Sequence, residues 1–301
     1  MSDKRASAAT GNVTVRLGYV GLGNIGGPMA GRLAKWDGGL TVFDLSDEAV
    51  GKVVDQGATA ASSLADLAAR SDIIGICVLD DEQVRTVVAG DDGLLSGAAP
   101  GTIITVHSTI SPQTAVDLAA TCAEHDVTLL DAPISGGAAG AEQGRLAIMV
   151  GGDRASYETL KEPFGLVAGM LVHAGDDVGA GTKMKLARNL LHFISFTAAA
   201  EASKLAEAAG ISITKLGKVV RHTDAITGGA GSIILRDTTA PIEPDDFWYD
   251  VLRPVRTLGE KDLSLALELG RELDVDLPLG DIALRDFATG LGVPHREGEK
   301  R

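Results

Sequence analysis

The most informative stretch of the sequence is Leu17-Gly18-Tyr19-Val20-Gly21-Leu22-Gly23-Asn24-Ile25-Gly26. The spacing Gly-x-Gly-x-x-Gly stands there directly after an apolar run typical of a buried strand and directly before a segment that suits a helix. We expect Gly21 to allow a tight turn, Gly23 to let phosphate approach the backbone, and Gly26 to let helix and strand pack closely. The alternative is an ordinary turn in a Gly-rich chain, but the setting favours a dinucleotide-binding loop. The predicted contacts of that loop are Gly21, Leu22, Gly23, Asn24, Ile25 and Gly26.

An acidic residue stands where such a site needs one. Asp44 follows the second candidate strand, Thr41–Phe43, at roughly the 20-residue distance from the glycines that this kind of site uses. Its carboxylate can accept hydrogen bonds from both hydroxyls of the adenosine ribose, which predicts NAD as the cofactor. NADP is expected to bind worse, because its 2′-phosphate would meet like charge from Asp44, Asp47 and Glu48. The alternative is a surface carboxylate that caps a helix.

The first half of the chain alternates short apolar runs with longer Ala- and Leu-rich segments. This pattern is typical of strand–helix–strand units and predicts an α/β fold, a doubly wound Rossmann domain with a parallel sheet. Segments such as Gly27–Lys35 and Pro112–Glu124 suit the helices. The candidate strands are Val15–Val20, Thr41–Phe43, Ile73–Val78, Ile103–Val106, Thr128–Asp131 and Ala147–Val150.

The pattern changes after a Gly-rich turn at residues 175–181. A long helix is expected from Thr182 to about Ala209, closed by Gly210 in a C-cap position. Three later segments also suit helices: Thr214–His222, Leu258–Leu273 and Ile282–Gly290. The expected domains are a flexible tail over residues 1–12, an NAD-binding Rossmann domain over 13–178, and an all-helical substrate and oligomerisation domain over 179–301, joined by the long helix.

Composition excludes several classes of protein. The 301 residues, 45% of them hydrophobic, give room for two domains with sizeable cores. The formal charge of −14 repels nucleic acid and anionic membrane surfaces, so we expect neither as a partner. Cys77 and Cys122 lie in apolar runs and suit buried, reduced thiols better than a disulfide framework or a metal site. No apolar signal precedes the first strand, which predicts a cytoplasmic location.

Five segments carry recognisable motifs: residues 18–30 (GYVGLGNIGGPMA), 106–112 (VHSTISP), 131–137 (DAPISGG), 179–189 (GAGTKMKLARN) and 261–266 (KDLSLA). Together they resemble the β-hydroxyacid dehydrogenase family, whose members include 3-hydroxyisobutyrate dehydrogenase and tartronate semialdehyde reductase. The resemblance spans Val13 to about Gly292. It implies hydride transfer between a nicotinamide cofactor and a small β-hydroxyacid.

The motif at residues 131–137 is similar to the family's substrate-binding signature. The resemblance implies that Ser135, Gly136 and Gly137 hold the substrate carboxylate through the Ser hydroxyl and the backbone N–H groups. Successive N–H groups in a Gly-rich turn can form such an anion-binding nest. The alternative is an ordinary turn after a strand.

The motif at residues 179–189 looks like the family's Gly-x-Gly-x-x-x-Lys-x-x-Asn-Asn pattern. Lys185 aligns with the catalytic lysine, which exchanges a proton with the substrate oxygen while the hydride moves. Asn189 stands four residues later, on the same helix face, and aligns with a residue that orients substrate. A lone lysine on a helix is usually a solvated charge, as we expect for Lys183, and only the alignment singles out Lys185.

The resemblance also implies further cofactor contacts. Thr109 aligns with a residue that approaches the nicotinamide, and Leu79 and Asp80 occupy the loop against the adenine, where Asp80 replaces the family's Pro. Lys261 is implied to reach the cofactor or active site from the second domain, with Asp262 holding the start of its helix. A structural role is expected for His107.

Two positions depart from the family pattern. Arg188 stands where an Asn is usual, which places a cation near the site or points one outward, and Pro254 stands where a Phe often covers the substrate. The cluster Phe247-Trp248-Tyr249 could supply that wall through Trp248, or it could be core packing between helices.

The sequence as a whole predicts an NAD-dependent oxidoreductase that interconverts a small anionic β-hydroxyacid and its semialdehyde. An NADPH-dependent aldehyde or imine reductase and a non-catalytic dinucleotide-sensing protein are the alternatives. The Ala- and Ser-rich long helix suits close packing across a junction. The resemblance implies a homodimer or homotetramer.

Overall fold

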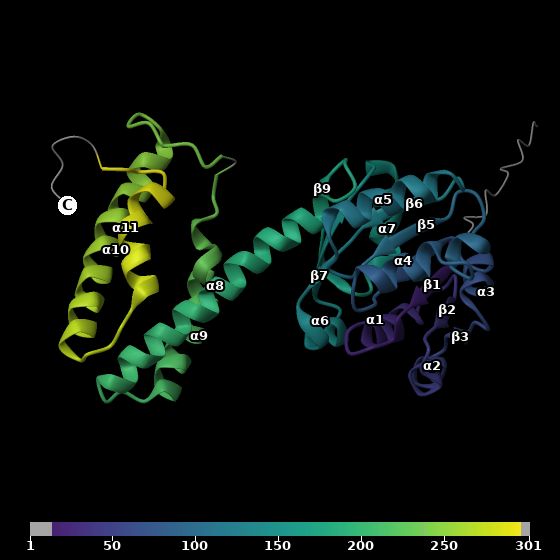
Figure 1. Ribbon diagram of the computed structural model, residues 1–301, viewed down its shortest axis with the longest axis horizontal. Helices are drawn as coiled ribbons and strands as arrows, with labels where there is room; N and C mark the ends of the chain where they lie inside the picture. The colour runs from purple at the N-terminus through teal and green to yellow at the C-terminus, as the bar shows by residue number, and fades with distance from the viewer. Residues whose placement is uncertain (1–13, 237, 296–301) are drawn as a thin grey trace, which may run out of the picture. The chain divides into compact units, whose positions relative to one another are not determined.

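The computed structural model describes residues 14–236 and 238–295, except for the side chains of residues 265 and 269. The chain divides into two compact units, Met1–Arg188 and Asn189–Arg301. Each unit is treated by itself, although helix α8 (Ala180–Ala208) contributes residues to both (Figure 1). In the described part of the chain, no helix is long and apolar enough to cross a membrane.

A single mixed sheet runs through the first unit (Figure 1). Strands β3, β2, β1, β4, β5 and β6 lie side by side in that order and are all parallel, as a doubly wound domain requires. The described strands are β1 (Leu17–Val20), β2 (Leu40–Phe43), β3 (Thr59–Ala60), β4 (Ile73–Ile76), β5 (Ile103–Val106), β6 (Thr128–Asp131), β7 (Ile134–Ser135), β8 (Leu146–Gly151) and β9 (Ala168–Gly175).

The sheet is not parallel throughout, which corrects the sequence-based expectation. Strand β8 pairs antiparallel with both β6 and β7, and β9 continues the sheet beyond β8. Strands β3, β7 and β9 were not expected. Two of them have only two residues each. Strand β9 lies at an edge with Met170 exposed, and its apolar run Met170-Leu171-Val172 is short and directly follows Gly169.

Helices cover both faces of the sheet. Neighbouring strand residues point to opposite faces, and accordingly Ile73 belongs to one buried cluster and Ile74 to the other. The first cluster packs under α1 and α7, and the second under α3, α4 and α5. The helices of this unit are α1 (Gly26–Leu33), α2 (Asp47–Val54), α3 (Leu64–Ala69), α4 (Asp81–Ala89), α5 (Pro112–Ala123), α6 (Gly137–Gln143) and α7 (Arg154–Phe164), with the 3-10 turn η1 (Leu94–Ser96).

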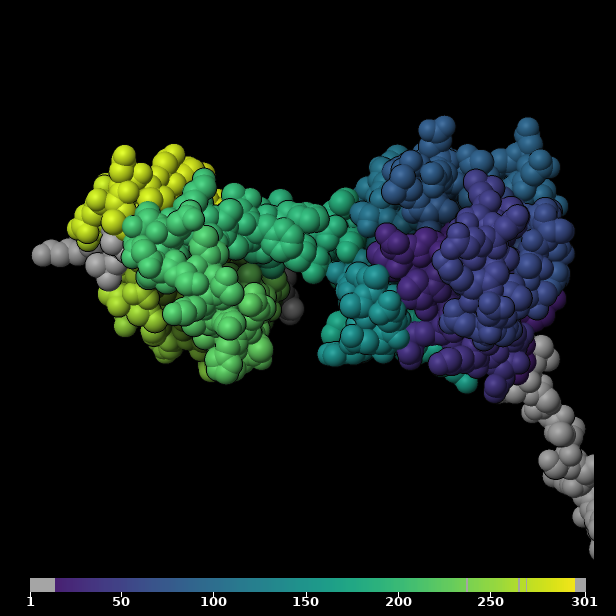
Figure 2. Space-filling view, turned by 90° about the horizontal axis from the view of Figure 1, so that it is seen from below, coloured from purple at the N-terminus to yellow at the C-terminus, as the bar shows by residue number. Residues whose placement is uncertain are grey.

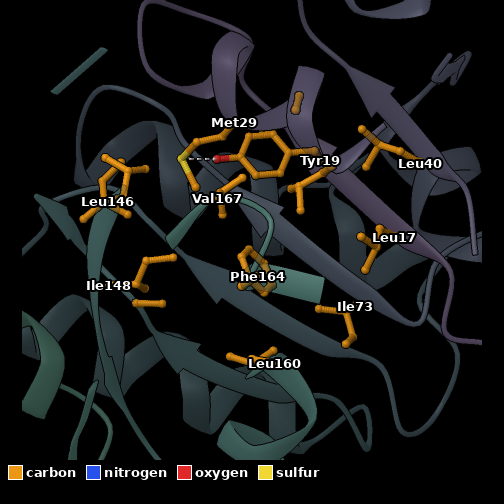
Figure 3. Packing of buried hydrophobic residues seen from close by; sticks show 14 of the residues in the cluster. Leu17, Tyr19, Met29, Leu40, Ile73, Leu146, Ile148, Leu160, Phe164 and Val167 are labelled. Atoms are coloured by element: carbon orange, nitrogen blue, oxygen red, sulfur yellow. Dashed lines mark hydrogen bonds between the residues drawn. The ribbon is translucent and has the colours of Figure 1, made fainter. Parts of the chain in front are cut away.

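An aromatic stack lies at the centre of the first cluster. The ring of His107 stacks on Tyr19 at 5.9 Å between centroids and tilts against Phe164 at 5.1 Å. The Tyr19 hydroxyl points at the sulfur of Met29, 3.2 Å away, and Phe164 lies among the same apolar side chains (Figure 3). His107 is 2% exposed, its Nδ1 lies 2.9 Å from the carbonyl oxygen of Ala132, and burial lowers its pKa to about 4. His107 therefore forms part of the core, in agreement with the structural role expected for it.

The second unit is helical. Its elements are the end of α8, α9 (Ile213–Thr227), the 3-10 turn η2 (Gly229–Ile233), α10 (Phe247–Glu272) and α11 (Pro278–Gly290). Helices α10 and α11 lie side by side (Figure 1), and the Glu201 carboxylate on α8 accepts the Leu279 and Gly280 N–H groups at the start of α11. Helix α10 begins at Phe247, well before the expected start, so Asp262 lies inside the helix and not at its beginning.

Replacement of His107 by Asn is expected to flatten the loss of stability in acid. An unfolded chain protonates histidine near pH 6.5, whereas the fold keeps His107 neutral down to about pH 4. Its contribution is therefore fully present above pH 6.5 and is lost as the pH falls toward 4, by up to about 3 kcal/mol. Urea unfolding at about pH 7 and about pH 4.5 measures this difference. The control His125→Asn removes an exposed histidine and should keep the wild-type fall; an equal fall in His107→Asn contradicts the assignment.

Candidate active site

The glycine loop between β1 and α1 has the geometry that its spacing predicts. Gly21 has a φ of +88°, a conformation that only glycine adopts readily. A Cβ at Gly26 would collide with the carbonyl oxygen of Gly21, so that glycine lets the helix approach the strand end. Gly23 is exposed and has open space where a Cβ would stand. The loop therefore presents bare backbone at the start of α1, as a bound pyrophosphate needs.

Asp44 follows β2 and lies next to the glycine loop. Its Oδ2 accepts the Leu22 N–H at 2.6 Å, and its Oδ1 accepts the Ser46 N–H at 2.8 Å. Each carboxylate oxygen has a further lone pair, so both can still accept a ribose hydroxyl. Leu22 differs from the exposed residues that follow it in the loop, because its side chain is buried and its N–H donates to Asp44.

A pocket of about 850 Å³ lies over the carboxyl ends of β1, β2 and β4. It has a polar end at the glycine loop and Asp44, and an apolar side that includes Leu64, Val78 and Val87. Bare glycine backbone, a ribose-binding carboxylate and an apolar wall together fit the adenosine and pyrophosphate of a dinucleotide. The predicted contacts that line it are Gly21, Gly23, Asn24, Ile25, Gly26, Asp44, Leu79 and Asp80.

Asp80 departs from the family pattern for a local reason. It is the N-cap of α4, where its Oδ1 accepts the Gln83 N–H at 2.9 Å. The preceding residue, Leu79, is 80% exposed and leaves its side chain free to lie against a ligand. The carboxylate at position 80 thus stabilises the helix behind the pocket.

Ser108 is a site residue that the sequence analysis missed. Its hydroxyl donates to the Val78 carbonyl oxygen at 2.7 Å and accepts the Val78 N–H at 3.0 Å, and the residue is 5% exposed. These two bonds join the loop after β4, which lines the pocket, to the loop after β5, which carries the exposed Thr109. Thr109 itself does not line the pocket, and its predicted contact with the nicotinamide stays a prediction.

The predicted substrate loop lies at the start of α6. Ser135 ends β7 and is half-buried, while Gly136 and Gly137 are exposed, with φ values of +132° and +63°. Helix α6 packs beside α1, teal against purple in Figure 2, and Arg32 of α1 donates from Nη1 to the Glu142 carbonyl oxygen at 3.2 Å. The helix that follows the substrate loop is thereby tied to the helix that follows the glycine loop.

Lys185 and Lys183, two residues apart on α8, lie in different surroundings. Lys183 is exposed, whereas Lys185 is only 7% exposed. Burial, and next the nearby positive charge of Arg188, hold the pKa of Lys185 below its usual value of 10.5. A shielded amine that loses its proton more easily is suited to proton transfer.

The remaining candidates lie on α8 and α10. Asn189 is half-buried, four residues after Lys185 on the same helix. Lys261 of the second unit is exposed and forms an ion pair with Asp262 at 2.9 Å. Tyr249 belongs to the small core of that unit and Trp248 packs against it, whereas Phe247 is 73% exposed. The aromatic cluster is thus in part core packing. The contacts predicted for Asn189 and Lys261 stay predictions.

Metal ligation has no candidate in the described parts of the chain, where no three His, Cys, Asp or Glu side chains are grouped to hold an ion.

Comparison with known proteins defines the class of protein first. Residues 16–175 match the model of the NAD-binding domain of 6-phosphogluconate dehydrogenase, and residues 179–293 match that of the NAD-binding domain of NADP-dependent 3-hydroxyisobutyrate dehydrogenase. The fold, the glycine loop and these matches define an NAD(P)-dependent oxidoreductase. More particularly, the chain belongs to the 3-hydroxyisobutyrate dehydrogenase-like family of β-hydroxyacid dehydrogenases.

Three similar proteins match the chain over nearly their full length. It is 56% identical to an uncharacterized oxidoreductase of Mycobacterium tuberculosis, over 95% of this chain and 96% of that one. It is 34% identical to 2-(hydroxymethyl)glutarate dehydrogenase of Eubacterium barkeri, over 93% and 91% of the two chains. A crystal structure of a putative oxidoreductase from Mycobacterium avium 104 is 55% identical and superposes with a TM-score of 0.90, covering 93% of this chain and all of that one.

Replacement of Ser108 by Ala is expected to raise the KM for the dinucleotide. The variant loses both bonds to Val78, so the loop lining the pocket is no longer held. A loss of about 1 kcal/mol for a pair of such bonds corresponds to about a fivefold increase in KM, with kcat changed less than about twofold. The control is Ser96→Ala, which removes a hydroxyl bonded to the Gly93 carbonyl oxygen at a residue that does not line the pocket. An unchanged KM in Ser108→Ala contradicts this role.

Proposed function

We propose that this protein is a dehydrogenase that uses NAD to interconvert a small anionic β-hydroxyacid and its semialdehyde, with Lys185 as the proton-transfer residue. The observation that carries the proposal is the contrast between Lys185 and Lys183. Two lysines on one helix turn differ in burial, and the buried one has the lowered pKa and aligns with the family's catalytic position. A lysine on the surface would not be buried, and burial would not lower its pKa.

In the proposed reaction the bound nicotinamide supplies the hydride acceptor. The neutral amine of Lys185 accepts the proton of the substrate hydroxyl as the carbon that bears this hydroxyl gives its hydride to the nicotinamide. In the reverse direction the ammonium donates that proton to the carbonyl oxygen of the semialdehyde. The lowered pKa of Lys185 makes both protonation states accessible at lower pH than for an ordinary lysine.

Ser135, Gly136 and Gly137 are proposed to hold the substrate carboxylate, with Asn189 orienting the substrate beside Lys185. The positive φ values of the two glycines support this role, because they leave backbone N–H groups uncovered by side chains. Since Arg188 adds a cation close enough to Lys185 to shift its pKa, the site favours an anionic substrate. A second carboxylate on the substrate, as in the compound that names the Eubacterium barkeri relative, would suit that charge.

NAD is proposed over NADP because of the charge of the pocket. Asp44, Asp80 and Glu82 line it, and none of the lining residues that the structure describes is Lys, Arg or His. A 2′-phosphate near Asp44 would meet like charge without compensation. The family model of the second unit names an NADP-dependent enzyme, so this choice is specific to the side chains of this chain.

A homodimer or homotetramer is also proposed. Five large apolar side chains lie exposed within two turns of α8: Leu190, Leu191, Phe193, Ile194 and Phe196. Soluble proteins seldom leave such a patch uncovered. The formal charge of −14 disfavours a nucleic acid or an anionic membrane as the cover of this patch, whereas the same apolar patch on a second copy suits it.

Burial raises the pKa of Cys77 to about 11 and that of Cys122 to about 12, which supports inert thiols. A cytoplasmic location is proposed as well, because free cysteines are typical of a reducing compartment.

Replacement of Lys185 by Ala is expected to lower kcat by about 100-fold to 10,000-fold, the usual contribution of one proton-transfer group. Binding of NADH, followed by its fluorescence, should stay within about twofold of wild type, because Lys185 does not line the dinucleotide pocket. The matched control is Lys183→Ala, two residues away and exposed, which should keep wild-type kcat. Full turnover by Lys185→Ala would reject the mechanism.

An initial-rate screen with NAD and NADP against small hydroxyacids and semialdehydes tests the reaction and the cofactor together. We expect NAD to be preferred, and Asp44→Ser to shift the ratio of kcat/KM values toward NADP by at least about tenfold, because the repelling charge is removed. The control is Asp55→Ser, which removes an exposed carboxylate at the far end of α2 that does not line the pocket. A preference of the wild type for NADPH with aldehydes or imines supports the alternative reductase, and dinucleotide binding without turnover of any substrate supports a sensing protein.

A further inference from the structure

Asp131 is a fully buried carboxylate for which the proposed reaction has no role. It ends β6, is 0% exposed, and accepts two backbone N–H groups from a segment about 50 residues further along the chain. The Gly179 N–H donates to Oδ1 at 2.7 Å and the Thr182 N–H donates to Oδ2 at 2.6 Å. These distances are at the short end for charge-assisted hydrogen bonds.

These donors lie at the start of α8, where Gly179 directly precedes the helix and Thr182 is its third residue. The helix begins at Ala180, and its opening N–H groups have no partner within the helix. The carboxylate of Asp131 supplies that partner, and the positive end of the helix dipole compensates its charge. Asp131 therefore fixes where α8 begins.

Lys185 lies one turn after Thr182 on the same helix. The burial of the Lys185 side chain depends on that turn, because a helix that begins at another residue would turn a different face toward the sheet. On the other side, Asp131 is four residues before Ser135 and is followed by Ala132, whose N–H donates to the Val106 carbonyl oxygen at 2.8 Å. One short segment thus carries both the anchor of the lysine helix and the predicted substrate loop.

The packing around the carboxylate leaves no room for adjustment. A Cβ at Gly151 would collide with Asp131 Oδ1 and would come within 2.6 Å of the Gly181 nitrogen. A Cβ at Gly181 would collide with the Met149 carbonyl oxygen. The two glycines let the start of α8 sit directly against the ends of β6 and β8, so a shift of the carboxylate must shift the helix.

We propose that Asp131 is a positioning residue that sets Lys185 in register with the substrate loop, through its two hydrogen bonds to the start of α8. This inference rests on the proposed function of Lys185. Asp131 does not take part in proton transfer itself, and its effect is on the placement of the amine.

Asp131→Asn is the direct test. The amide keeps one acceptor oxygen but turns an NH₂ group toward the second N–H donor, so one of the two bonds is lost. We expect kcat to fall by about tenfold to 100-fold, as for a misplacement on the order of 1 Å, while the KM for NAD changes less than about twofold. In the Lys185→Ala background the same substitution should lower the residual rate by less than about twofold, because a residue that acts through Lys185 has no effect without it.

The matched control is Asp153→Asn. Asp153 caps α7 by accepting the Ser156 N–H at 2.9 Å, and that helix carries no predicted site residue. Thermal unfolding should shift downward in both variants, but kcat should fall only in Asp131→Asn.

A second pair of variants covers the case in which Asp131→Asn does not fold. Gly151→Ala pushes a methyl group against the carboxylate and against the Ala180 and Gly181 nitrogens, and leaves the charge of Asp131 intact. By displacing the carboxylate together with the start of α8 it should also lower kcat by about tenfold or more. Gly51→Ala is its control, since a Cβ there has open space around it.

The outcomes separate the two proposals. A large loss of kcat in Lys185→Ala together with wild-type kcat in Asp131→Asn and Gly151→Ala overturns the positioning role alone. Full activity of Lys185→Ala overturns the proposed function. An equal, additive loss from Asp131→Asn in the presence and absence of Lys185 shows a general structural effect and also overturns the positioning role.

Discussion

The site of the first unit depends on one constraint: parallel strands end at the same edge of a sheet. Strands β1, β2, β4 and β5 run side by side in one direction, so the segments that follow them meet there. The glycine loop, Asp44, Leu79 and Thr109 each follow one of these strands. Residues from four separate places in the sequence become neighbours without any contact between their own side chains. The direction and order of the strands therefore determine where the site lies, whichever residues occupy the loops.

Short-range patterns allowed much of this to be predicted. The glycine spacing identified the turn between β1 and α1, and apolar runs gave six strands to within two residues at either end. Strands β5 and β6 have the expected bounds, and β8 extends one residue further at each end than expected. Strands β3 and β7 were missed because two residues carry no periodicity, and the early start of α10 was missed because Pro254 stands inside it. Strand β9 was missed because its apolar run, Met170-Leu171-Val172, is short and directly follows Gly169.

The dinucleotide pocket and the start of α8 carry charges of opposite sign. The dinucleotide pocket is lined by carboxylates, whereas the start of α8 carries Lys185 with Arg188 nearby. An acidic pocket suits ribose hydroxyls, which donate hydrogen bonds, and cations suit a substrate that carries a carboxylate. Lys185 and Arg188 are two basic residues on one helix turn of a chain whose formal charge is −14. In the proposed reaction, the dinucleotide and the substrate would therefore have different electrostatic surroundings within the first unit.

The hydrogen bonds that the sequence analysis did not predict share a physical reason. Ser108 bonds to the backbone of Val78, Asp44 to that of Leu22, and Asp131 to the N–H groups of Gly179 and Thr182. In each case a side chain meets a backbone group 22 to 51 residues away. Every residue except proline has the same N–H, so the sequence on the donor side holds no sign of the partner. A sequence motif can identify the residues that contact a ligand. The hydrogen bonds that hold those residues in place connect a motif residue to a backbone group whose sequence has no recognisable pattern. Only the fold shows which two groups meet.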